Sequence, residues 1–454
     1  MEMGGLLMPM EIVRQLPYDH PYRWDGTLFG GPKLWRPNDL AGSLALWLDA
    51  EDTASITLNG VNVSQWADKS GNGRNASQAT ASAQPAFATS QNLLQWSEQF
   101  NNAFWTKRGT ATITANDTTA PDGTLTADRL SGLNTTTNDI FNSNYLSFIM
   151  GTPGAAFTPS IYIKRISTTG TFSIGNTVND NLYGRWTVDL AQLPDAWVRI
   201  TATTTGVTVN NAFVFDPSGY GGMLLRGVTG GALSMHIWGA QINRTAVLGA
   251  YQKTEGTPVL DIGGKPTVNW SGVNGVFLDT PVFSLAPNRK YASFAVAASP
   301  TWGGGARYGR LWISRSGYTF GYLGQGDPAG TALAVGGTTS VSTLVSGVSQ
   351  ANVLSNSFGT SGLAADSFDI AVNGGTPATF TGATGGLGTN GIRIGADGSA
   401  GVSAWDGQIG EIVIISGDLS ADDRRRMEGY LAWKWALEGK LPANHPYKLF
   451  PPTV

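Results

Sequence analysis

Short runs of alternating apolar and polar residues recur along most of this chain. Two such runs flank Asn59-Gly60, a dipeptide that is typical of a two-residue β-hairpin turn. Similar runs predict strands at 110–116, 160–166, 172–178, 196–205, 213–216, 234–242, 291–299, 309–317, 368–374, 392–397 and 409–416. Strands this short, joined by turn residues, indicate β-sandwiches.

A helical pattern is convincing only near the C-terminal end. Long or apolar side chains recur there at helical spacing, at Met427, Tyr430, Leu431, Lys434 and Trp435. Ser420 is a good N-cap, and Asp423 follows it at the spacing of a capping box. We expect Gly439 and Pro442 to end the helix and its stripe to pack back on a sandwich.

The amino-acid composition excludes several classes of fold and function. Glycine supplies 60 of the 454 residues and only 13% are charged, which excludes a long helical bundle. A net charge of -3 provides no positive field, so we expect no nucleic-acid partner. The absence of cysteine excludes disulfides and thiol nucleophiles. The sequence also contains no apolar run long enough to span a bilayer and no signal-peptide pattern at its start.

Two separated groups of motifs resemble one known domain type. The segment 44–78 contains Trp66, Asp68 and the turn 70–73 (Ser-Gly-Asn-Gly), and residues 409–435 contain an IGEIVII strand and a GYLAWKW helix. These motifs resemble the concanavalin A-like (laminin-G-like) jelly-roll domains of tailed-phage virion proteins. That family runs from a QP-x-[FY] segment directly into a GKP strand. Here QPAF ends at Phe87 and GGKP begins only at Gly263, so the resemblance implies an insertion.

The inserted sequence resembles a different domain. It begins with NLLQWSEQF at 92–100, continues to HIWGAQ at 236–241 and closes with YQKT at 251–254. This combination is similar to a carbohydrate-binding-module-like sandwich that recurs in phage fibres. One domain is therefore expected inside a loop of another, which is tolerated when the ends of the inserted domain lie close together.

The predicted fold class is all-β, with two nested antiparallel β-sandwiches (jelly rolls), one C-terminal α-helix and extended terminal arms. The predicted divisions are an N-terminal docking arm at 1–37, the concanavalin A-like sandwich at 38–88 and 258–440, the inserted carbohydrate-binding-module-like sandwich at 89–257, and a C-terminal strap at 441–454.

The chain contains one short internal repeat, LPYDHPYRW at 16–24 and LPANHPYKL at 441–449. Both segments are interpreted as polyproline-like straps on one surface, or as equivalent docking elements in a repeating assembly. The docking residues would be His20, Tyr22, Trp24, His445 and Tyr447. A metal pair of the two histidines is disfavoured, because no acidic cluster supports it.

Metal binding and catalysis find little support. Asp68 and Asn72 offer oxygen ligands for calcium, but bracing of their own turn is the favoured interpretation. A glycosidase needs two facing carboxylates, and Glu411 and Asp406 are expected on opposite strand faces. The acids of the insertion are interpreted as turn formers: Asp122, Asp128, Asp189, Asp195 and Asp216. We therefore expect no enzyme and no required cofactor.

Sugar binding is the better candidate, because sugar rings stack on flat aromatic side chains. The candidate aromatic residues are Trp302, Tyr308 and Trp312 in a glycine-rich segment, and Tyr183 and Trp186 in the insertion. The alternative for each is burial in a core. Trp197 and Trp238 fall in apolar strands, and we expect both to be core residues.

The resemblances imply a non-enzymatic protein on the surface of a tailed-phage or phage-like virion, made in the host cytoplasm. Its expected activity is adhesion to host or environmental glycans. Its expected partners are other virion proteins, capsid or tail, reached through the terminal arms, and further copies of itself. The alternatives are a capsid decoration or cementing protein that binds no glycan and, less favoured, a tailspike-type polysaccharide depolymerase.

Overall fold

The computed structural model describes residues 33–40, 42–88, 90, 92–133, 139–142, 158–178, 181–201, 222–229, 231–243, 248–256, 258–259, 262, 264–272, 275–284, 290–299, 309–315, 322–325, 331–336, 339–344, 351–382, 390–396 and 403–454. Within them the secondary structure is mostly β, with one α-helix, α3 (Ala421–Lys434), so the predicted all-β class with a C-terminal helix is confirmed. The strand predicted at 213–216 lies outside the described residues.

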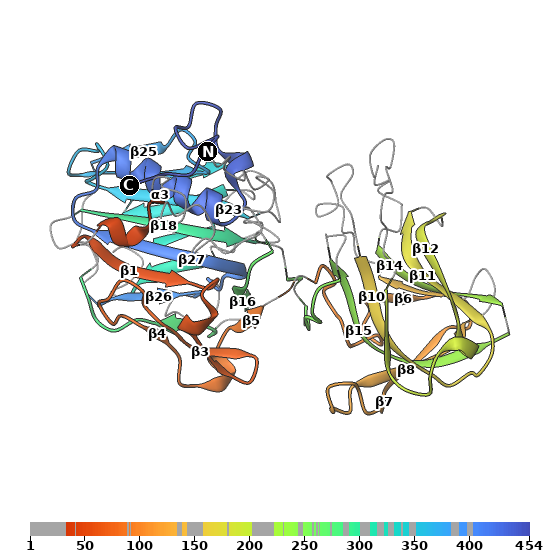
Figure 1. Ribbon diagram of the computed structural model, residues 1–454. Helices are drawn as coiled ribbons and strands as arrows, with labels where there is room; N and C mark the ends of the chain where they lie inside the picture. Colours follow the sequence, from red (N-terminus) through yellow and green to blue (C-terminus); the bar gives the residue numbers. More distant parts are fainter. Residues whose placement is uncertain are drawn as a thin grey trace, which may run out of the picture. The chain divides into compact units, whose positions relative to one another are not determined.

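The chain forms two compact units (Figure 1). One, called here the flanking unit, comprises the chain up to Phe87 and from Lys265 onward. The other, the inserted unit, comprises Ala88–Gly264, where the sequence placed an insertion at 89–257. Each unit is described by itself.

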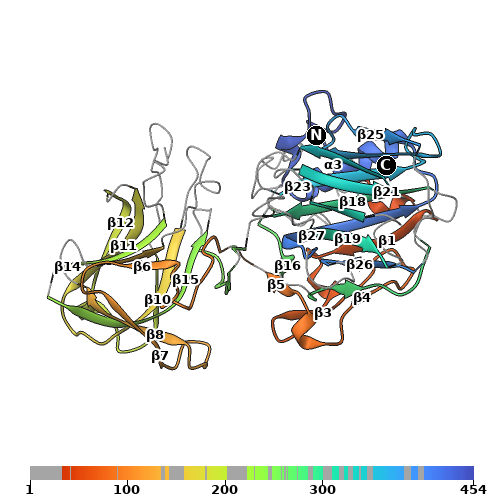
Figure 2. The same cartoon turned by 180° about the vertical axis from the view of Figure 1, so that it is seen from behind.

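The strands of the flanking unit form two layers around one core (Figures 1 and 2). The first layer contains, in order, β25 (Ala378–Thr381), β24 (Ser367–Val372), β23 (Asn352–Phe358), β18 (Tyr291–Ala298) and β27 (Asp406–Ser416), with β1 (Leu44–Asp49) and β16 (Thr267–Ser271) beside β27.

The second layer contains, in order, β22 (Thr339–Leu344), β21 (Thr331–Gly336), β20 (Tyr322–Gln325), β19 (Arg310–Ser314), β26 (Ile392–Ile394), β17 (Leu278–Asp279), β4 (Ala76–Ser77), β3 (Asn62–Trp66) and β2 (Ile56–Asn59). Strand β5 (Ala86–Ala88) pairs with both β3 and β16 and joins the layers. The predicted hairpin at Asn59-Gly60 is confirmed as β2–β3, with Gly60 at a φ of +64°.

Segments from before and after the insertion lie end to end along one strand. Val413 of β27 pairs with Trp47 of β1, and Ile409 of the same strand pairs with Val268 of β16. Both pairings are antiparallel and use the same edge of β27, because β18 occupies the other edge. The two halves of the flanking sequence therefore complete one sheet.

Helix α3 covers the outer face of the first layer, over β23 and β18 (Figure 1). Ser420 caps it as predicted: its Oγ accepts a hydrogen bond from the Asp423 N–H at 3.0 Å and donates one to the Asp423 carboxylate at 2.7 Å. The predicted stripe is buried, at Met427, Tyr430, Leu431, Lys434 and Trp435. Because core and helix cover opposite faces, β18, β23 and most of β27 are buried on both sides.

The C-terminal segment 441–454 packs back on the flanking unit. The Trp433 indole N–H donates to the Tyr447 carbonyl at 2.8 Å, and Tyr447 lies over Gly429 of α3. A Cβ at Gly429 would lie 2.6 Å from the Tyr447 side chain, so this close approach requires glycine. The end of the chain then bridges Leu34 through Thr453.

The inserted unit is a sandwich of two five-stranded antiparallel sheets. The first contains β13 (Val198–Thr201), β10 (Thr158–Arg165), β15 (Leu233–Asn243), β8 (Ala127–Leu133) and β7 (Thr112–Thr118). The second contains β12 (Asn181–Asp189), β11 (Thr171–Val178), β14 (Gly222–Thr229), β9 (Asp139–Asn142) and β6 (Trp105–Lys107). Short 3-10 helices elsewhere are Pro37–Leu40, Thr53–Ser55, Ala81–Ala83, Leu190–Gln192 and Glu438–Lys440.

The two ends of the inserted unit are tied together by buried polar side chains. Asn92 donates from its amide to the carbonyls of Ala240 and Gln252, at 3.0 and 2.8 Å. The Ser97 hydroxyl accepts from the Thr254 N–H at 2.9 Å. Backbone bridges pair Asn92 with Val259 and Trp96 with Glu255. The chain therefore enters and leaves this unit at neighbouring positions.

Candidate functional site

Four aromatic side chains gather on the outward face of the first sheet of the inserted unit: Tyr162, Trp197, Trp238 and Tyr251, called here the aromatic cluster. The ring centroids of Tyr162 and Trp238 lie 5.4 Å apart, and those of Trp238 and Tyr251 lie 4.5 Å apart. Trp238 is only 3% exposed, whereas the other three side chains are half-buried. The cluster therefore presents three partly exposed rings, which pack against the buried ring of Trp238.

Strand alternation determines which side chains reach this face. On β10, Ile161 and Ile163 point into the core, so Tyr162 between them points outward. Tyr162 stands opposite Trp238 of β15 in the antiparallel register. A shift of register follows at Gly239, whose φ is +63° and whose Cβ would lie 3.1 Å from both Tyr162 and Tyr251. Glycine at this bulge lets the three rings approach each other.

Polar groups that can bind hydroxyls border the rings. The Arg199 guanidinium, from β13, lies 5.4 Å from the Tyr162 ring centroid and donates to the Ser160 hydroxyl at 3.1 Å. Its Nε is buried and, within the described residues, has no hydrogen-bond partner. On the other side, His236 Nε2 lies 2.9 Å from Asp117 Oδ2. Aromatic rings beside such donors and acceptors are the arrangement that sugars require.

A carboxylate and a lysine close the Tyr251 end of the cluster. The Tyr251 hydroxyl donates to Glu98 Oε1 at 2.8 Å, and Lys253 Nζ lies 3.2 Å from Glu98 Oε2. Burial raises the pKa of Glu98, and attraction to Lys253 partly offsets that rise. Burial also raises the pKa of Tyr251 well above its ordinary value, so its hydroxyl stays a donor at neutral pH.

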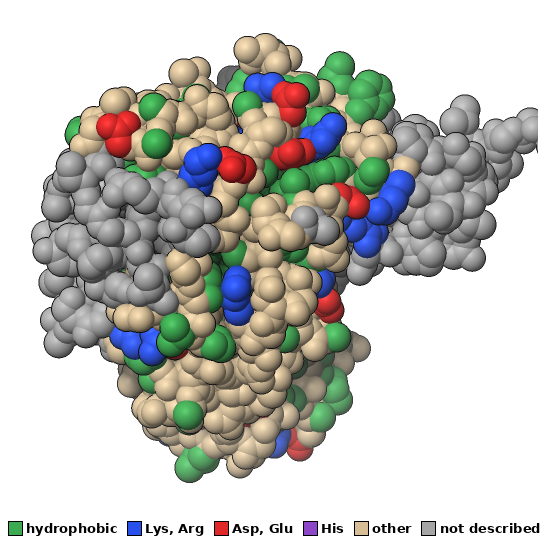
Figure 3. Space-filling view, turned by 90° about the vertical axis from the view of Figure 1, so that its left-hand side faces the viewer, with side chains coloured by type: hydrophobic (Ala, Val, Ile, Leu, Met, Phe, Trp, Pro, Cys, Tyr) green, Lys and Arg blue, Asp and Glu red, His purple; other side chains and the backbone are tan. Residues whose placement is uncertain are grey.

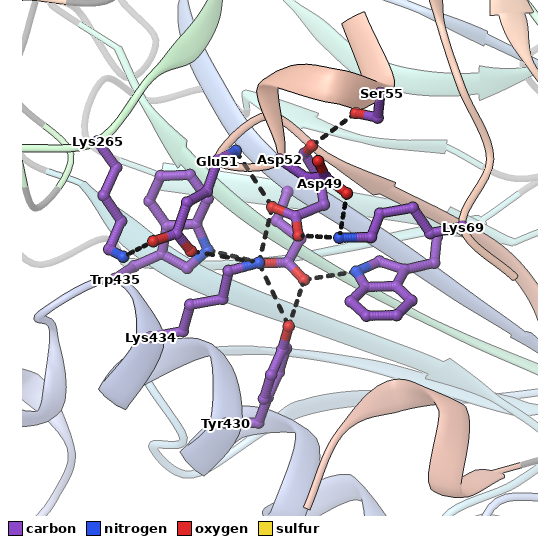
Figure 4. Close-up of polar contacts among 11 residues, drawn as sticks. Asp49, Glu51, Asp52, Ser55, Lys69, Lys265, Tyr430, Lys434 and Trp435 are labelled. Atoms are coloured by element: carbon purple, nitrogen blue, oxygen red, sulfur yellow. Dashed lines mark hydrogen bonds and ion pairs between the residues drawn. The ribbon is translucent and has the colours of Figure 1, made fainter. Parts of the chain in front are cut away.

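The flanking unit contains a second polar cluster, which is buried between α3 and the first layer (Figure 4). Lys434 Nζ lies 2.7 Å from Asp49 Oδ1 of β1 and 2.8 Å from Glu411 Oε2 of β27. Glu411 also accepts hydrogen bonds from the Trp47 indole, the Tyr430 hydroxyl and the Trp435 indole, at 2.7, 3.0 and 2.7 Å.

Burial shifts the ionisation of this cluster. It raises the pKa of Glu411, against the attraction of Lys434. Burial would also raise the pKa of Asp49, but the ion pairs with Lys434 and Lys69 outweigh it, and the pKa is lowered. The pKa of Lys434 is raised because both carboxylates outweigh its burial. With its carboxylates committed to Lys434 beneath the helix, the cluster holds α3 on the sheet.

On the face of the flanking unit that Figure 3 shows, acidic and basic side chains lie side by side. This face therefore has no large patch of a single charge. Ion pairs on the surface of the flanking unit include Lys33 with Asp39 and Lys290 with Asp418, at 2.9 and 2.6 Å. In the part of the chain that the structure describes, no three His, Asp or Glu side chains are grouped to hold a metal ion. No helix there is long and apolar enough to cross a bilayer.

The predicted sugar-binding role of Trp312 is wrong. It is 0% exposed and belongs to the core of the flanking unit, within β19, whose five residues are all buried. Trp302 and Tyr308 lie outside the described residues. Tyr183 and Trp186 belong to β12, but the positions of their side chains are not described.

The predicted docking residues at the C-terminal end point into the protein. His445 is 7% exposed and its Nε2 lies 3.5 Å from Glu428 Oε2, while Tyr447 covers α3. The strap interpretation fits this geometry. A docking role for His445 is contradicted because its side chain is buried, whereas a docking role for the partly buried Tyr447 stays a prediction. His20, Tyr22 and Trp24 lie outside the described residues.

The turn at 70–73 explains the roles of Asp68 and Asn72. The Asp68 carboxylate accepts hydrogen bonds from the N–H groups of Trp47, Ser70 and Arg74 at 2.9–3.0 Å. The Asn72 amide donates to the carbonyls of Leu44 and Ala45. Both side chains brace the turn against β1, as the favoured interpretation has it. Calcium binding stays a prediction.

Sequence reasoning missed several residues of the aromatic cluster. Trp238 is buried as expected, and Trp197, which precedes β13, is partly buried against it, with its indole N–H donating to the Thr119 carbonyl. Tyr162 was not singled out, although its position between two isoleucines signals an outward side chain. Asp128 was expected in a turn, but it lies in β8 and accepts backbone N–H groups of Phe100 and Asn116 at 3.0 and 2.9 Å.

The comparisons with known proteins yield distant structural likenesses. No protein-family model and no curated protein matches the chain. The CBM22-1 xylan-binding domain of Paenibacillus barcinonensis Xyn10C is 15% identical, with a TM-score of 0.22 over 35% of this chain and 94% of that domain. The enzymatically active domain of bacteriophage CBA120 tailspike protein 2 is 15% identical, with a TM-score of 0.28 over 43% of this chain and 29% of that one. The tripod from the bacteriophage Tuc2009 baseplate is 14% identical, with a TM-score of 0.23 over 57% and 82%. TM-scores this low carry no argument about the function of this chain.

Proposed function

We propose that this protein is a non-enzymatic, glycan-binding component of the surface of a tailed-phage or phage-like virion. The observation that carries glycan binding is the aromatic cluster, in which the partly buried Tyr162, Trp197 and Tyr251 lie beside hydrogen-bonding side chains on one sheet face. The virion assignment rests on the resemblance of the sequence motifs to those of phage virion proteins.

The environment of the carboxylates at this face supports binding over hydrolysis. A glycosidase needs one carboxyl group as acid and a second as base or nucleophile across the scissile bond. Asp117 is bonded to His236, and Glu98 is bonded to Tyr251 and Lys253. Both groups are thus engaged as partners of neighbouring side chains.

Attachment to the particle is a second part of the proposal. Three large apolar side chains are exposed near the C-terminal end: Leu449, Phe450 and Val454, at 70%, 62% and 68%. They lie within the strap, on side chains that the fold leaves exposed, and are available to other virion proteins or to sister copies. The same observation favours the alternative candidate, a decoration protein that cements its neighbours without binding a glycan.

A glycan array probed with the full-length protein tests the adhesion proposal. Trp197→Ala is expected to weaken binding at least about fivefold, since one aromatic contact contributes about 1 kcal/mol or more. Phe450→Ala is the matched control, because it removes an exposed ring from the other unit. Binding to no glycan would leave the decoration protein as the better candidate.

Release of reducing sugars from bound polysaccharide tests the non-enzymatic part. We expect none. Progressive release that requires the folded protein would overturn this part and establish a depolymerase.

A further inference from the structure

We propose that the ligand of the aromatic cluster is an acidic glycan, in which a sugar carboxylate binds a row of basic side chains next to the rings. The inference rests on the proposed function and adds the chemical class of the sugar. Its basis is the position of Arg129, His236 and Lys164, called here the basic row.

The strand register places the basic row on the same face as the aromatic cluster. Arg129 of β8 pairs with His236 of β15, and His236 pairs with Lys164 of β10. Directly opposite residues of neighbouring strands project from the same face, with Cβ atoms about 5 Å apart. Lys164 follows Tyr162 by two residues on one strand, so their side chains also share a face.

The spacing of the two rows suits one sugar unit with its carboxylate. Two residues along a strand span about 7 Å, and this separates the basic row from Tyr162 and Trp238. A pyranose ring on the aromatic cluster can therefore extend an exocyclic carboxylate to the basic row. Trp197 links the two rows, since its ring centroid lies 6.5 Å from that of His236.

The charges at this face leave a cationic surplus. Asp117 contacts the basic row, 2.9 Å from His236 and 3.6 Å from Arg129, whose side chain is 43% exposed. Within the described part of the chain, half-buried Lys164 makes no ion pair, and Arg199 adds a further cation beside Tyr162. At the far end, Lys253 pairs with both Glu98 and Glu255, at 3.2 and 2.7 Å, so that end has no spare cation. The surplus is confined to the basic row, where Asp117 faces the permanent cations Arg129, Lys164 and Arg199.

This surplus discriminates between sugars. A carboxylate that binds Lys164 and Arg129 gains charge-assisted hydrogen bonds, which are about twice as strong as neutral ones. A neutral sugar gains only the ring contacts and ordinary hydrogen bonds. A local surplus of this kind is notable in a chain whose net charge is -3.

Matched glycan pairs test the inference. An array of uronic-acid and sialic-acid glycans, including polygalacturonate and polysialate, is printed beside the same glycans after chemical reduction of their carboxyl groups. The full-length protein is expected to bind its acidic ligand roughly tenfold more tightly than the reduced partner at low ionic strength. Added salt should remove most of that preference.

The variants separate the two contributions. Lys164→Gln should abolish most of the acid preference while binding to the reduced glycan is unchanged, and Trp197→Ala should weaken both. Lys33→Gln, at an exposed lysine of the flanking unit, is the matched control and should behave as wild type.

Equal binding of an acidic glycan and its reduced partner would overturn the inference and leave the proposed function intact. Retention of the acid preference by Lys164→Gln would also overturn it. Binding to no glycan, acidic or neutral, would instead overturn the proposed function.

Discussion

At the scale of single residues, two charged residues of the sequence motifs are buried and form an ion pair. Glu411 and Lys434 stand in the strand and helix motifs of the flanking unit, and the structure pairs them at 2.8 Å. Lys434 belongs to the helical stripe that the sequence predicts, and its side chain is only 3% exposed. A hydrophobic pattern shows that a position is buried, and it does not show which charge neutralises a lysine there.

Lys434→Met is expected to destabilise the flanking unit by about 3–5 kcal/mol, because it leaves Glu411 buried without its cation and Asp49 with Lys69 alone. Urea denaturation of the full chain measures this. Lys290→Met is the control: it removes an ion pair with exposed Asp418 and should cost less than about 1 kcal/mol. Similar losses in the two variants would contradict the assigned role of Lys434.

Asp128 gives a prediction for pH. Burial raises its pKa to about 6, although backbone N–H groups partly oppose the shift. The unfolded residue loses its proton near pH 4, so at intermediate pH the folded state binds more protons and rising pH favours unfolding. This residue alone should lower the unfolding free energy of the inserted unit by up to about 3 kcal/mol between about pH 4 and 7.

Asp128→Asn removes the titration, so its denaturation free energies should fall less over this range than those of the wild type. Asp195→Asn, at an exposed position, should follow the wild-type curve. Parallel curves for wild type and Asp128→Asn would show that the carboxyl group does not titrate in this way.

At the scale of elements, the sequence predicted those with strong local signals. The hairpin at Asn59-Gly60 and the Ser420 cap of α3 are local, and both are confirmed. Strand β23 escaped prediction because helix and core bury both its faces, including Ser355 and Asn356, so it shows no alternation. The aromatic cluster could not be assembled from sequence, because it depends on the register of β10 with β15.

The C-terminal strap depends on one glycine of α3. Gly429→Ala would place a Cβ 2.6 Å from Tyr447, so the strap should be displaced, with a stability loss of about 1–3 kcal/mol. Limited proteolysis should then cleave within residues 441–454 faster than in the wild type. Gly439→Ala, where a Cβ meets nothing within 4 Å, is the control and should leave cleavage unchanged. Equal cleavage in both variants would contradict this account of the strap.

At the scale of the whole molecule, the chain forms two cores, and the sequence of one is inserted into the sequence of the other. The flanking unit needs β1 and β16 along β27, and the inserted unit lies between them in sequence. Motif spacing indicated this organisation, since the QPAF and GGKP segments are separated. Composition and periodicity alone would not have revealed it, because both units consist of short strands.

Replacing residues 89–264 by a short Gly-Ser linker should leave a folded flanking unit. The expectation follows because the bridges Asn92–Val259 and Trp96–Glu255 already hold the ends of the inserted unit together. Circular dichroism and calorimetry of the shortened chain should show one cooperative unfolding transition. Its midpoint temperature should be close to that at which the flanking unit unfolds in the intact protein. A shortened chain without a cooperative transition would show that the two units fold interdependently.

The adjacent ends of the inserted unit have an evolutionary consequence. A unit whose ends lie at neighbouring positions can be exchanged by recombination at two short junctions, while the flanking unit keeps its sequence. Lineages that share the flanking unit should therefore carry unrelated inserted units at this position, and such an exchange would require no change in the core of the flanking unit.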